Sequence, residues 1–299
     1  MPDFNLQNSS LGKIAPTPGK YDASLLYRIP RSDHRIKYQI HLSKLSFTGV
    51  DVWNCYELSF MTDNGLPVSG ILKLIYSAES QYIIESKSLK LYLSSFNMER
   101  IGSTIVNAGK NILRIIEADL EKLLETTVSL SFFTNNENEK QAFPEFYQKN
   151  LYDLIGEDNL YSMKINTFEE TPELLYGELS NNMHEYVFHT DVLRSNCSVT
   201  NQPDWGDVFF KMQTKYVVDL KSVLAYLVSF RKEQHFHEDV AEMLYKSFFE
   251  AFQPKQLMIA IRYTRRGGID INPIRASHID LIDVAFTNPQ ILLTKTFRQ

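Results

Sequence analysis

The chain has 299 residues, of which 43% are hydrophobic, and a formal net charge of −5. This length and apolar content suffice for two domains of ordinary size, and the acidic balance argues against direct binding of nucleic acid. The sequence has neither an apolar run of about eighteen residues nor a basic-then-apolar N-terminus, which predicts a soluble, cytoplasmic protein without membrane contact. Cys55 and Cys197 are its only cysteines and fit free thiols in a reducing cytosol.

The first half of the chain predicts an extended arm followed by strands and helices. The stretch LGKIAPTPGKYDASLLYRIPR is rich in proline and opposes helix formation. β-Branched and aromatic residues predict strands over 50–60, 71–75 and 126–133, with a turn at Asp63-Asn64-Gly65. Apolar periodicity predicts helices over 86–96 and 103–124. The polar run 134–140 is the best candidate for the end of this unit.

The second half repeats the same order of elements. Strands are predicted around 192–199, 208–218, 257–263 and 269–272, and helices over 220–232 and 238–252. Each half therefore predicts an antiparallel sheet with its helices gathered on one face, which is an α+β and not a parallel α/β arrangement.

Two stretches are near-copies of each other, which indicates a duplication. YIIESKSLKLYLSSF begins at Tyr82 and YVVDLKSVLAYLVSF begins at Tyr216, and seven of their fifteen aligned positions are identical. Divergence after duplication allows each half to keep a different part of one site.

The densest cluster of reactive side chains is SNCSVTNQPDWGD, which contains Cys197 and Asp204. A cysteine thiolate can add to an electrophilic carbon, and a nearby acid can move the protons that this step requires. The commoner role of a free cysteine is that of a small buried hydrophobic residue, and spacing alone leaves both interpretations open.

Two further clusters lie near predicted helix starts. His237 and Glu238 stand between the two helices of the second half, although acidic residues there are also explained by the helix dipole. Glu85, Ser86, Lys87 and Ser88 open the first helix of the first half. Its backbone N–H groups and Lys87 could bind an anion, or the cluster could be an ordinary cap.

The stretch RYTRRGGIDINPIR places Arg266 beside Gly267, so cationic side chains adjoin backbone that a ligand can approach closely. A phosphate-bearing cofactor fits this pattern, as does a solvated hairpin tip. The sequence contains no G-x-G-x-x-G after a strand, no phosphate-binding G-x-x-x-x-G-K-[ST] and no C-x-x-C. Cys197 with His184, His189 or His237 matches no usual zinc spacing, so no metal is predicted.

Together these motifs resemble one family, the NADPH-dependent 7-cyano-7-deazaguanine reductases of queuosine biosynthesis, in their long two-module branch. The likeness rests on ESKSLKLYLSSFN, SNCSVTNQPDWGD, FHE and RYTRRGGIDINP, which occur in this order. It implies two tandem tunnelling-fold (T-fold) modules, residues 1–145 with the arm and the ESKS motif and residues 146–299 with the cysteine. The first half lacks the cysteine segment and the His-Glu pair, which implies one site per chain.

The resemblance also implies the reaction and its residues. Cys197 would add to the nitrile of the deazapurine substrate to form a thioimide, with Asp204 moving the proton, and two NADPH would be consumed per amine formed. Substrate binding is implied for Glu85, Ser86, Lys87, His237 and Glu238, and NADPH binding for Lys87, Ser88, Arg266 and Gly267. A homodimer is expected. The alternatives are a cysteine-dependent nitrile or amidine hydrolase, a zinc-dependent T-fold pterin or purine enzyme, and a non-catalytic purine-binding module.

Overall fold

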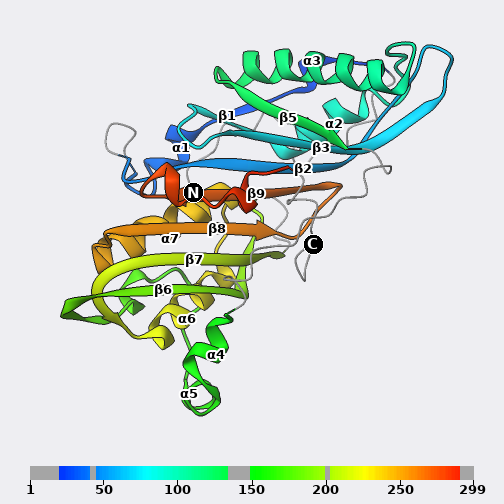
Figure 1. The fold of residues 1–299 in the computed structure, drawn as a ribbon. Coiled ribbons are helices and arrows are strands. Elements are labelled where there is room, and N and C mark those ends of the chain that lie inside the picture. The colour runs from blue at the N-terminus through cyan, green and yellow to red at the C-terminus, as the bar shows by residue number, and fades with distance from the viewer. Residues whose placement is uncertain (1–19, 41–44, 134–148, 199–202, 290–299) are drawn as a thin grey trace. The chain divides into compact units, whose positions relative to one another are not determined.

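The computed structural model describes residues 20–40, 45–133, 149–198 and 203–289 (Figure 1). These residues fall into two compact units. Unit 1 is drawn from Met1–Ser43, Asp51–Glu139 and Arg265–Asp270, and unit 2 from Lys44–Val50, Lys140–Thr264 and Ile271–Gln299. Each unit therefore contains a short segment from a distant part of the chain.

Unit 1 combines antiparallel strands with two main helices. Its strands follow the order β5-β3-β2, β3 pairs antiparallel with β5, and a separate pair joins β1 to β4. The long helix α3 lies along β5 (Figure 1). The elements in chain order are η2 (Ala23–Leu25), β1 (Arg28–Pro30), α1 (Arg31–Arg35), β2 (Thr48–Met61), β3 (Pro67–Ser77), β4 (Tyr82–Ile84), α2 (Ser86–Ser94), α3 (Ile105–Leu124) and β5 (Val128–Phe133).

The bounds of α3 follow from its sequence. The Thr104 side chain accepts a hydrogen bond from the Asn107 N–H at 3.2 Å and caps the first turn. One face is buried, and its members recur at about one helical turn, which anchors the helix on the strands. Those residues are Ala108, Ile112, Ile116, Leu120 and Leu124. The helix ends where Glu125 adopts a left-handed conformation with φ of 54°.

Unit 2 repeats this plan with longer strands. Its strands follow the order β9-β8-β7-β6 and the neighbours pair antiparallel. Helix α7 lies behind β8 and β7 in Figure 1, and helix α6 packs against β6. The elements are α4 (Leu151–Ile155), α5 (Glu157–Ser162), η5 (Pro172–Leu174), β6 (Gly177–Asn196), β7 (Pro203–Val218), α6 (Leu220–Ser229), η6 (Phe230–Lys232), α7 (His237–Phe252), β8 (Gln256–Tyr263), β9 (Ile269–Ala276), η7 (Ile279–Leu281) and η8 (Val284–Phe286).

The predicted α+β class with antiparallel sheets is confirmed, as are the helices of each half. The turn at 63–65 is also confirmed, because Gly65 donates its N–H to the Thr62 carbonyl at 2.8 Å and has a φ of +86°. The strand predicted over 192–199 is different: β6 runs from Gly177 to Asn196. Most side chains in its first half are exposed or half-buried, so pairing with β7 and not burial defines that part of the strand.

Several predicted features lie outside the described residues. They include the N-terminal part of the arm up to residue 19, the polar run 134–140 and residues 199–202 of the cysteine segment. In the part of the chain that the structure describes, no helix is both long and apolar enough to cross a bilayer.

Candidate active site

The β6–β7 hairpin of unit 2 brings the predicted nucleophile and its acid to the same end. Cys197 directly follows the last residue of β6, and Asp204 is the second residue of β7. Across the hairpin, Ser195 pairs with Asp204. The Cys197 thiol is partly exposed, whereas the Asp204 side chain is buried. A partly exposed cysteine and a desolvated acid at the same end of one hairpin form an arrangement that supports covalent catalysis with proton transfer.

A parallel bridge brings the start of α7 to this hairpin end. The Asn196 N–H donates to the Glu233 carbonyl at 2.8 Å, and the Asn196 carbonyl accepts from the His235 N–H at 3.2 Å. The next turn of chain places His237 Nε2 at 3.4 Å from Asp204 Oδ2. The structure thus brings together Asp204 and His237, which the sequence separates by more than thirty residues.

Tyr263 of β8 forms the wall of this site. The His237 ring stacks on the Tyr263 ring with centroids 3.8 Å apart and planes inclined by 9°. Burial raises the pKa of the Tyr263 phenol well above its ordinary value, and the negative charges of Asp204 and Glu238 raise it further, against a lowering contribution from Ser195. The phenol therefore stays neutral among buried carboxylates.

The glycine in the sequence D-W-G-D, Gly206, has to be small because it packs against this wall. A side chain on Gly206 would place its Cβ 2.7 Å from Ile261 Cγ2 and 3.3 Å from the Tyr263 ring. Gly206 pairs with Tyr263 across β7 and β8, and a larger residue there would displace Ile261 and crowd the ring. The roles of Tyr263 and Gly206 were not predicted from the sequence. The only indication was a glycine within a predicted strand, and the sequence does not show which residue pairs with it.

The carboxylate of Glu85 caps helix α2 in unit 1. It accepts hydrogen bonds from the backbone N–H groups of Lys87 at 2.7 Å and Ser88 at 2.9 Å. The Ser88 hydroxyl donates to the Glu85 carbonyl at 2.7 Å. Glu85 and Ser88 are buried, whereas Ser86 and Lys87 are partly exposed. The capping role expected as an alternative is therefore real, and it leaves Lys87 accessible to an anion.

The two glycines of R-R-G-G form a tight turn in the same unit. Arg266 and Ile269 exchange backbone hydrogen bonds of 2.8 and 3.2 Å, and Gly267 and Gly268 have φ values of +58° and +80°. Two positive φ values are those of a type I′ hairpin turn. A Cβ on Gly267 would lie 2.9 Å from the Nζ of Lys90, a residue of α2. The Lys90 side chain thus lies close to the turn, a contact that was not predicted from the sequence.

The predicted residues accordingly form two groups, each within its own unit. Cys197, Asp204, His237 and Glu238 belong to unit 2. Glu85, Ser86, Lys87, Ser88, Arg266 and Gly267 belong to unit 1. Arg266 and Gly267 come from the second half of the sequence, yet they group with unit 1 because the Tyr56 N–H donates to the Gly268 carbonyl at 2.7 Å.

Comparison with known proteins identifies the family. A family model described as "Nitrile reductase, 7-cyano-7-deazaguanine-reductase N-term" matches residues 18–132, and one described as "QueF-like protein" matches residues 203–280. The NADPH-dependent 7-cyano-7-deazaguanine reductase of Bordetella pertussis is 38% identical over 274 residues, 92% of this chain and 95% of the relative. This chain belongs to that reductase family. The reductase of Colwellia psychrerythraea is 36% identical and covers 94% of this chain.

A solved structure of an "archaeosine synthase QueF-Like in the apo form" also aligns with part of this chain. It is 15% identical, covers 33% of this chain and 98% of its own, and gives a TM-score of 0.29. At that similarity it establishes no correspondence of individual residues.

Cys55, the other cysteine of this chain, is unsuited to nucleophilic attack. Cys55 is buried in β2, and burial raises the pKa of its thiol strongly. The neighbouring Asp270 raises that pKa further, against a lowering contribution from Lys73. A thiol held neutral and out of solvent is unreactive, which leaves Cys197 as the accessible one.

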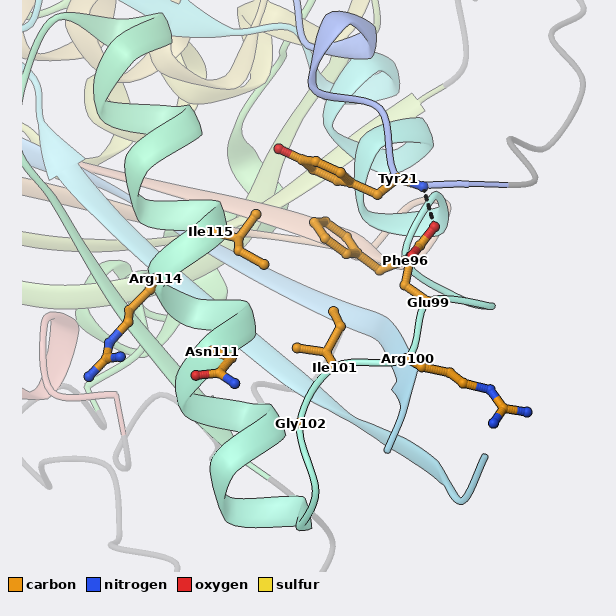
Figure 2. A pocket seen from close by; sticks show the side chains of 9 residues that line it. All are labelled: Tyr21, Phe96, Glu99, Arg100, Ile101, Gly102, Asn111, Arg114 and Ile115. Carbon is orange, nitrogen blue, oxygen red and sulfur yellow. Dashed lines mark hydrogen bonds between the residues drawn. The ribbon is translucent and has the colours of Figure 1, made fainter. Parts of the chain in front are cut away.

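A cavity of about 550 Å³ in unit 1 offers no alternative site for a nitrile reductase (Figure 2). The carboxylate of Glu99 accepts a hydrogen bond from the Tyr21 N–H at 2.9 Å, and Arg100 and Arg114 point away from the centre of the cavity (Figure 2). Among the described residues that line the cavity, the two arginines therefore do not converge on a position for a phosphate group. The residues lining it include none of those predicted for the site: Tyr21, Phe96, Glu99, Arg100, Ile101, Gly102, Asn111, Arg114 and Ile115.

The described residues contain no group of three or more His, Cys, Asp or Glu side chains placed to hold a metal ion.

Proposed function

We propose that this chain reduces the nitrile of 7-cyano-7-deazaguanine to the primary amine with NADPH, as a step in queuosine biosynthesis. Family membership supports the reaction class. The observation that carries the proposal is the pairing of His237 with buried Asp204, 3.4 Å apart, next to the strand end that bears the accessible Cys197. A thiol, an acid and an imidazole at one hairpin end are the groups that covalent capture of a nitrile requires.

Cys197 activates the nitrile by converting it into a better hydride acceptor. The thiolate sulfur forms a bond to the nitrile carbon, and one C≡N π pair becomes a lone pair on nitrogen that takes a proton from Asp204. The product is a thioimide. His237, hydrogen-bonded or ion-paired to Asp204, can return a proton to that carboxylate between steps.

The remaining steps consume two NADPH, each of which supplies one hydride. The first hydride reaches the thioimide carbon, and the C–S bond then breaks to release an imine and regenerate the Cys197 thiolate. The second hydride and a further proton convert the imine into the amine. The balance is one nitrile, two NADPH and two protons giving one amine and two NADP⁺.

Buried carboxylates explain how a deazaguanine would be recognised. Glu238 is 3% exposed, and a desolvated carboxylate favours a ligand that offers N–H donors. His237 is proposed to contact the same ligand. Ser86, Lys87 and Glu85 are assigned to the substrate on the resemblance. For Glu85 this requires that its carboxylate serve both helix α2 and the ligand, which about four lone-pair sites allow.

The NADPH phosphates are assigned to the cationic face of unit 1. Lys87 and Ser88 open α2, and Arg266 and Gly267 lie in the turn that Lys90 approaches. The ammonium groups of Lys87 and Lys90 and the guanidinium group of Arg266 are the cations that suit a phosphate. The T-fold assignment of both modules, the homodimer and the cytoplasmic location are further parts of the proposal and rest on sequence arguments.

The test mixes the purified chain with 7-cyano-7-deazaguanine and NADPH. We expect about two NADPH oxidised per amine formed, as four-electron reduction requires. A different ratio contradicts the proposal. Ammonia release without NADPH oxidation would support a cysteine hydrolase instead, and loss of activity on chelation would support a zinc enzyme.

A further inference from the structure

The residue before the nucleophile is held by its side chain as well as by its backbone. The Asn196 side chain is buried, its Oδ1 accepts from Arg194 Nη2 at 3.0 Å, and its Nδ2 donates to the Arg231 carbonyl at 3.2 Å. The backbone of Asn196 is already bridged to 233–235. Strand β6, helix segment η6 and the connection that leads into α7 are thus joined at one residue.

The groups around this amide are themselves fixed. Arg194 also donates to the Arg231 carbonyl, at 3.2 Å, and the guanidinium groups of Arg194 and Arg231 lie 5.8 and 5.4 Å from the centre of the Trp205 ring. Trp205 pairs with Arg194 across the hairpin, one residue after Asp204. The anchors of Asn196 therefore belong to the framework that also carries the acid.

Unit 1 contains the same backbone bridge without the side-chain anchor. There Met61, the last residue of β2, donates its N–H to the Glu99 carbonyl at 2.9 Å and accepts from the Ile101 N–H at 2.8 Å. A methionine side chain cannot donate a hydrogen bond, and among the described residues Met61 makes none through its side chain. The backbone bridge alone therefore suffices to build this fold.

We propose that Asn196 is a positioning residue: its amide side chain fixes the end of β6 so that the Cys197 thiol approaches the nitrile carbon from the side, at the oblique angle that addition to a C≡N bond requires. The inference rests on the proposed function of Cys197. Its physical reason is that attack needs the reacting atoms at near-contact distance and in the right orientation. A displacement of about 1 Å can cost on the order of a hundredfold in rate. The Asn196 side chain bonds to Arg194 and to the Arg231 carbonyl, so its effect on the reaction is exerted through the next residue.

The test measures covalent capture alone. Enzyme and 7-cyano-7-deazaguanine are mixed without NADPH, and the adduct at Cys197 is followed by intact-protein mass spectrometry over a range of nitrile concentrations. For Asn196→Ala we expect the limiting rate of adduct formation to fall by about 10- to 100-fold, with half-saturation within about threefold of wild type. Alkylation of Cys197 by iodoacetamide should change by less than about threefold, because a small free reagent needs no fixed orientation.

Two further variants separate positioning from folding. Asn196→Asp keeps the shape and the contact with Arg194 but loses the donor to the Arg231 carbonyl, so we expect a smaller loss of adduct rate. This variant decides the question if Asn196→Ala does not fold. Thr214→Val removes a buried hydrogen bond to the Phe252 carbonyl, 2.6 Å long, in β7 well away in sequence from the hairpin end. It should lower the unfolding temperature and leave the adduct rate unchanged.

The outcomes are distinct. Wild-type adduct rates in folded Asn196 variants overturn the inference. So does an equal fall in adduct formation and iodoacetamide alkylation, which would mean that Asn196 acts on the exposure or ionisation of the thiol. Absence of any adduct at Cys197 in the wild-type protein contradicts the proposed function itself.

Discussion

The two units share a framework of hydrogen bonds in which corresponding residues play the same part. In unit 1 the Tyr27 N–H donates to the Ser88 hydroxyl at 3.0 Å, and in unit 2 the Tyr176 N–H donates to the Ser222 hydroxyl at the same distance. Ser88 and Ser222 occupy identical positions in the two near-copies of sequence. The duplication that the sequence predicts is therefore also visible in how each helix is tied to the segment before it.

A second correspondence lies between the helices. Glu99 of unit 1 accepts from the Tyr21 N–H at 2.9 Å, and Glu233 of unit 2 accepts from the Glu170 N–H at 3.1 Å. These glutamates also supply the carbonyls of the bridges to Met61 and Asn196. Both units thus use one glutamate, in the connection between the two helices, to join the N-terminal segment to the end of the first long strand.

The units differ at the turn that follows this bridge. In unit 1 a short turn follows Met61, and Thr62 closes it by donating its N–H to the Leu66 carbonyl at 2.9 Å. In unit 2 Asn196 stands in the place of Met61 and Cys197 in the place of Thr62. The hydrogen bonds that the two units share therefore carry Asn196 and Cys197 at one end of unit 2 only, as the proposed role of Cys197 requires.

Replacing each cysteine with alanine, in separate variants, should give the largest difference in kcat between changes in the two units. Cys197→Ala removes the nucleophile and should lower kcat by at least about a thousandfold. Cys55→Ala should leave kcat near wild type, because that thiol is buried and its pKa is raised. Its cost should be a loss of unfolding free energy of about 1 kcal/mol from the cavity. Steady-state kinetics and chemical denaturation measure both; a dead Cys55→Ala enzyme that remains folded would contradict the assignment.

Replacement of Asp204 tests a second difference between the units, the presence of a buried carboxyl group in unit 2 only at this position. P-V-S-G follows the turn in unit 1 and P-D-W-G follows it in unit 2, so Val68 stands where Asp204 stands, and both side chains are buried. Asp204→Asn should lower kcat by about 10²- to 10⁴-fold, the range for loss of a general acid.

The control for this variant is Asp191→Asn in β6, which should retain activity. We expect both proteins to unfold cooperatively by circular dichroism. Full activity of Asp204→Asn would show that the proton reaches the nitrile nitrogen from another group.

Unlike the local elements, the assembly of the site was beyond sequence reasoning. Helix α3 and strand β2 were predictable because apolar spacing and β-branched residues dictate them locally. The contact of Tyr263 with His237 and of Lys90 with Gly267 depends on pairing between residues far apart in the chain. The exposed first half of β6 lacks an apolar pattern, so no periodicity revealed it.

The proposed phosphate-binding role of unit 1 can be tested at the turn that contains Gly267. Gly267→Ala places a Cβ 2.9 Å from the Lys90 ammonium and forces an L-residue to a φ of +58°. We expect the KM for NADPH to rise by about tenfold, the equivalent of one lost charge-assisted contact, with kcat little changed.

Gly156→Ala is the matched control. Gly156 also has a positive φ, +82°, but a Cβ there would meet nothing within 4 Å. Both variants should lose about 1 kcal/mol or more of unfolding free energy from backbone strain, whereas only Gly267→Ala should weaken NADPH. Equal KM values in the two proteins would remove the turn from the cofactor site.

The smallest expected effect concerns Glu170, the residue of unit 2 whose N–H donates to the Glu233 carboxylate. Unit 2 places the half-buried Glu170 where unit 1 has Tyr21, and burial raises the pKa of the Glu170 carboxyl above its ordinary value of 4.5. The nearby Glu233 raises that pKa further, against lowering contributions from a hydrogen bond of Tyr226 and from the charge of His235. The folded state thus favours the protonated form. The stability that this preference contributes is complete below pH 4.5 and is lost as the pH rises through the raised value.

Glu170→Gln should abolish that loss. Glutamine stays neutral and can still accept the Tyr226 hydroxyl, which donates to Glu170 Oε1 at 2.8 Å. The variant and the wild type should have similar unfolding free energies at pH 4, and the variant should be the more stable at pH 8 by less than about 1 kcal/mol, because the group is only partly shielded from solvent. Urea denaturation at the two pH values measures the difference. A wild type that gains stability relative to Glu170→Gln as the pH rises would reverse the sign and show that the carboxylate is stabilised in the folded protein, as a salt-bridged group would be.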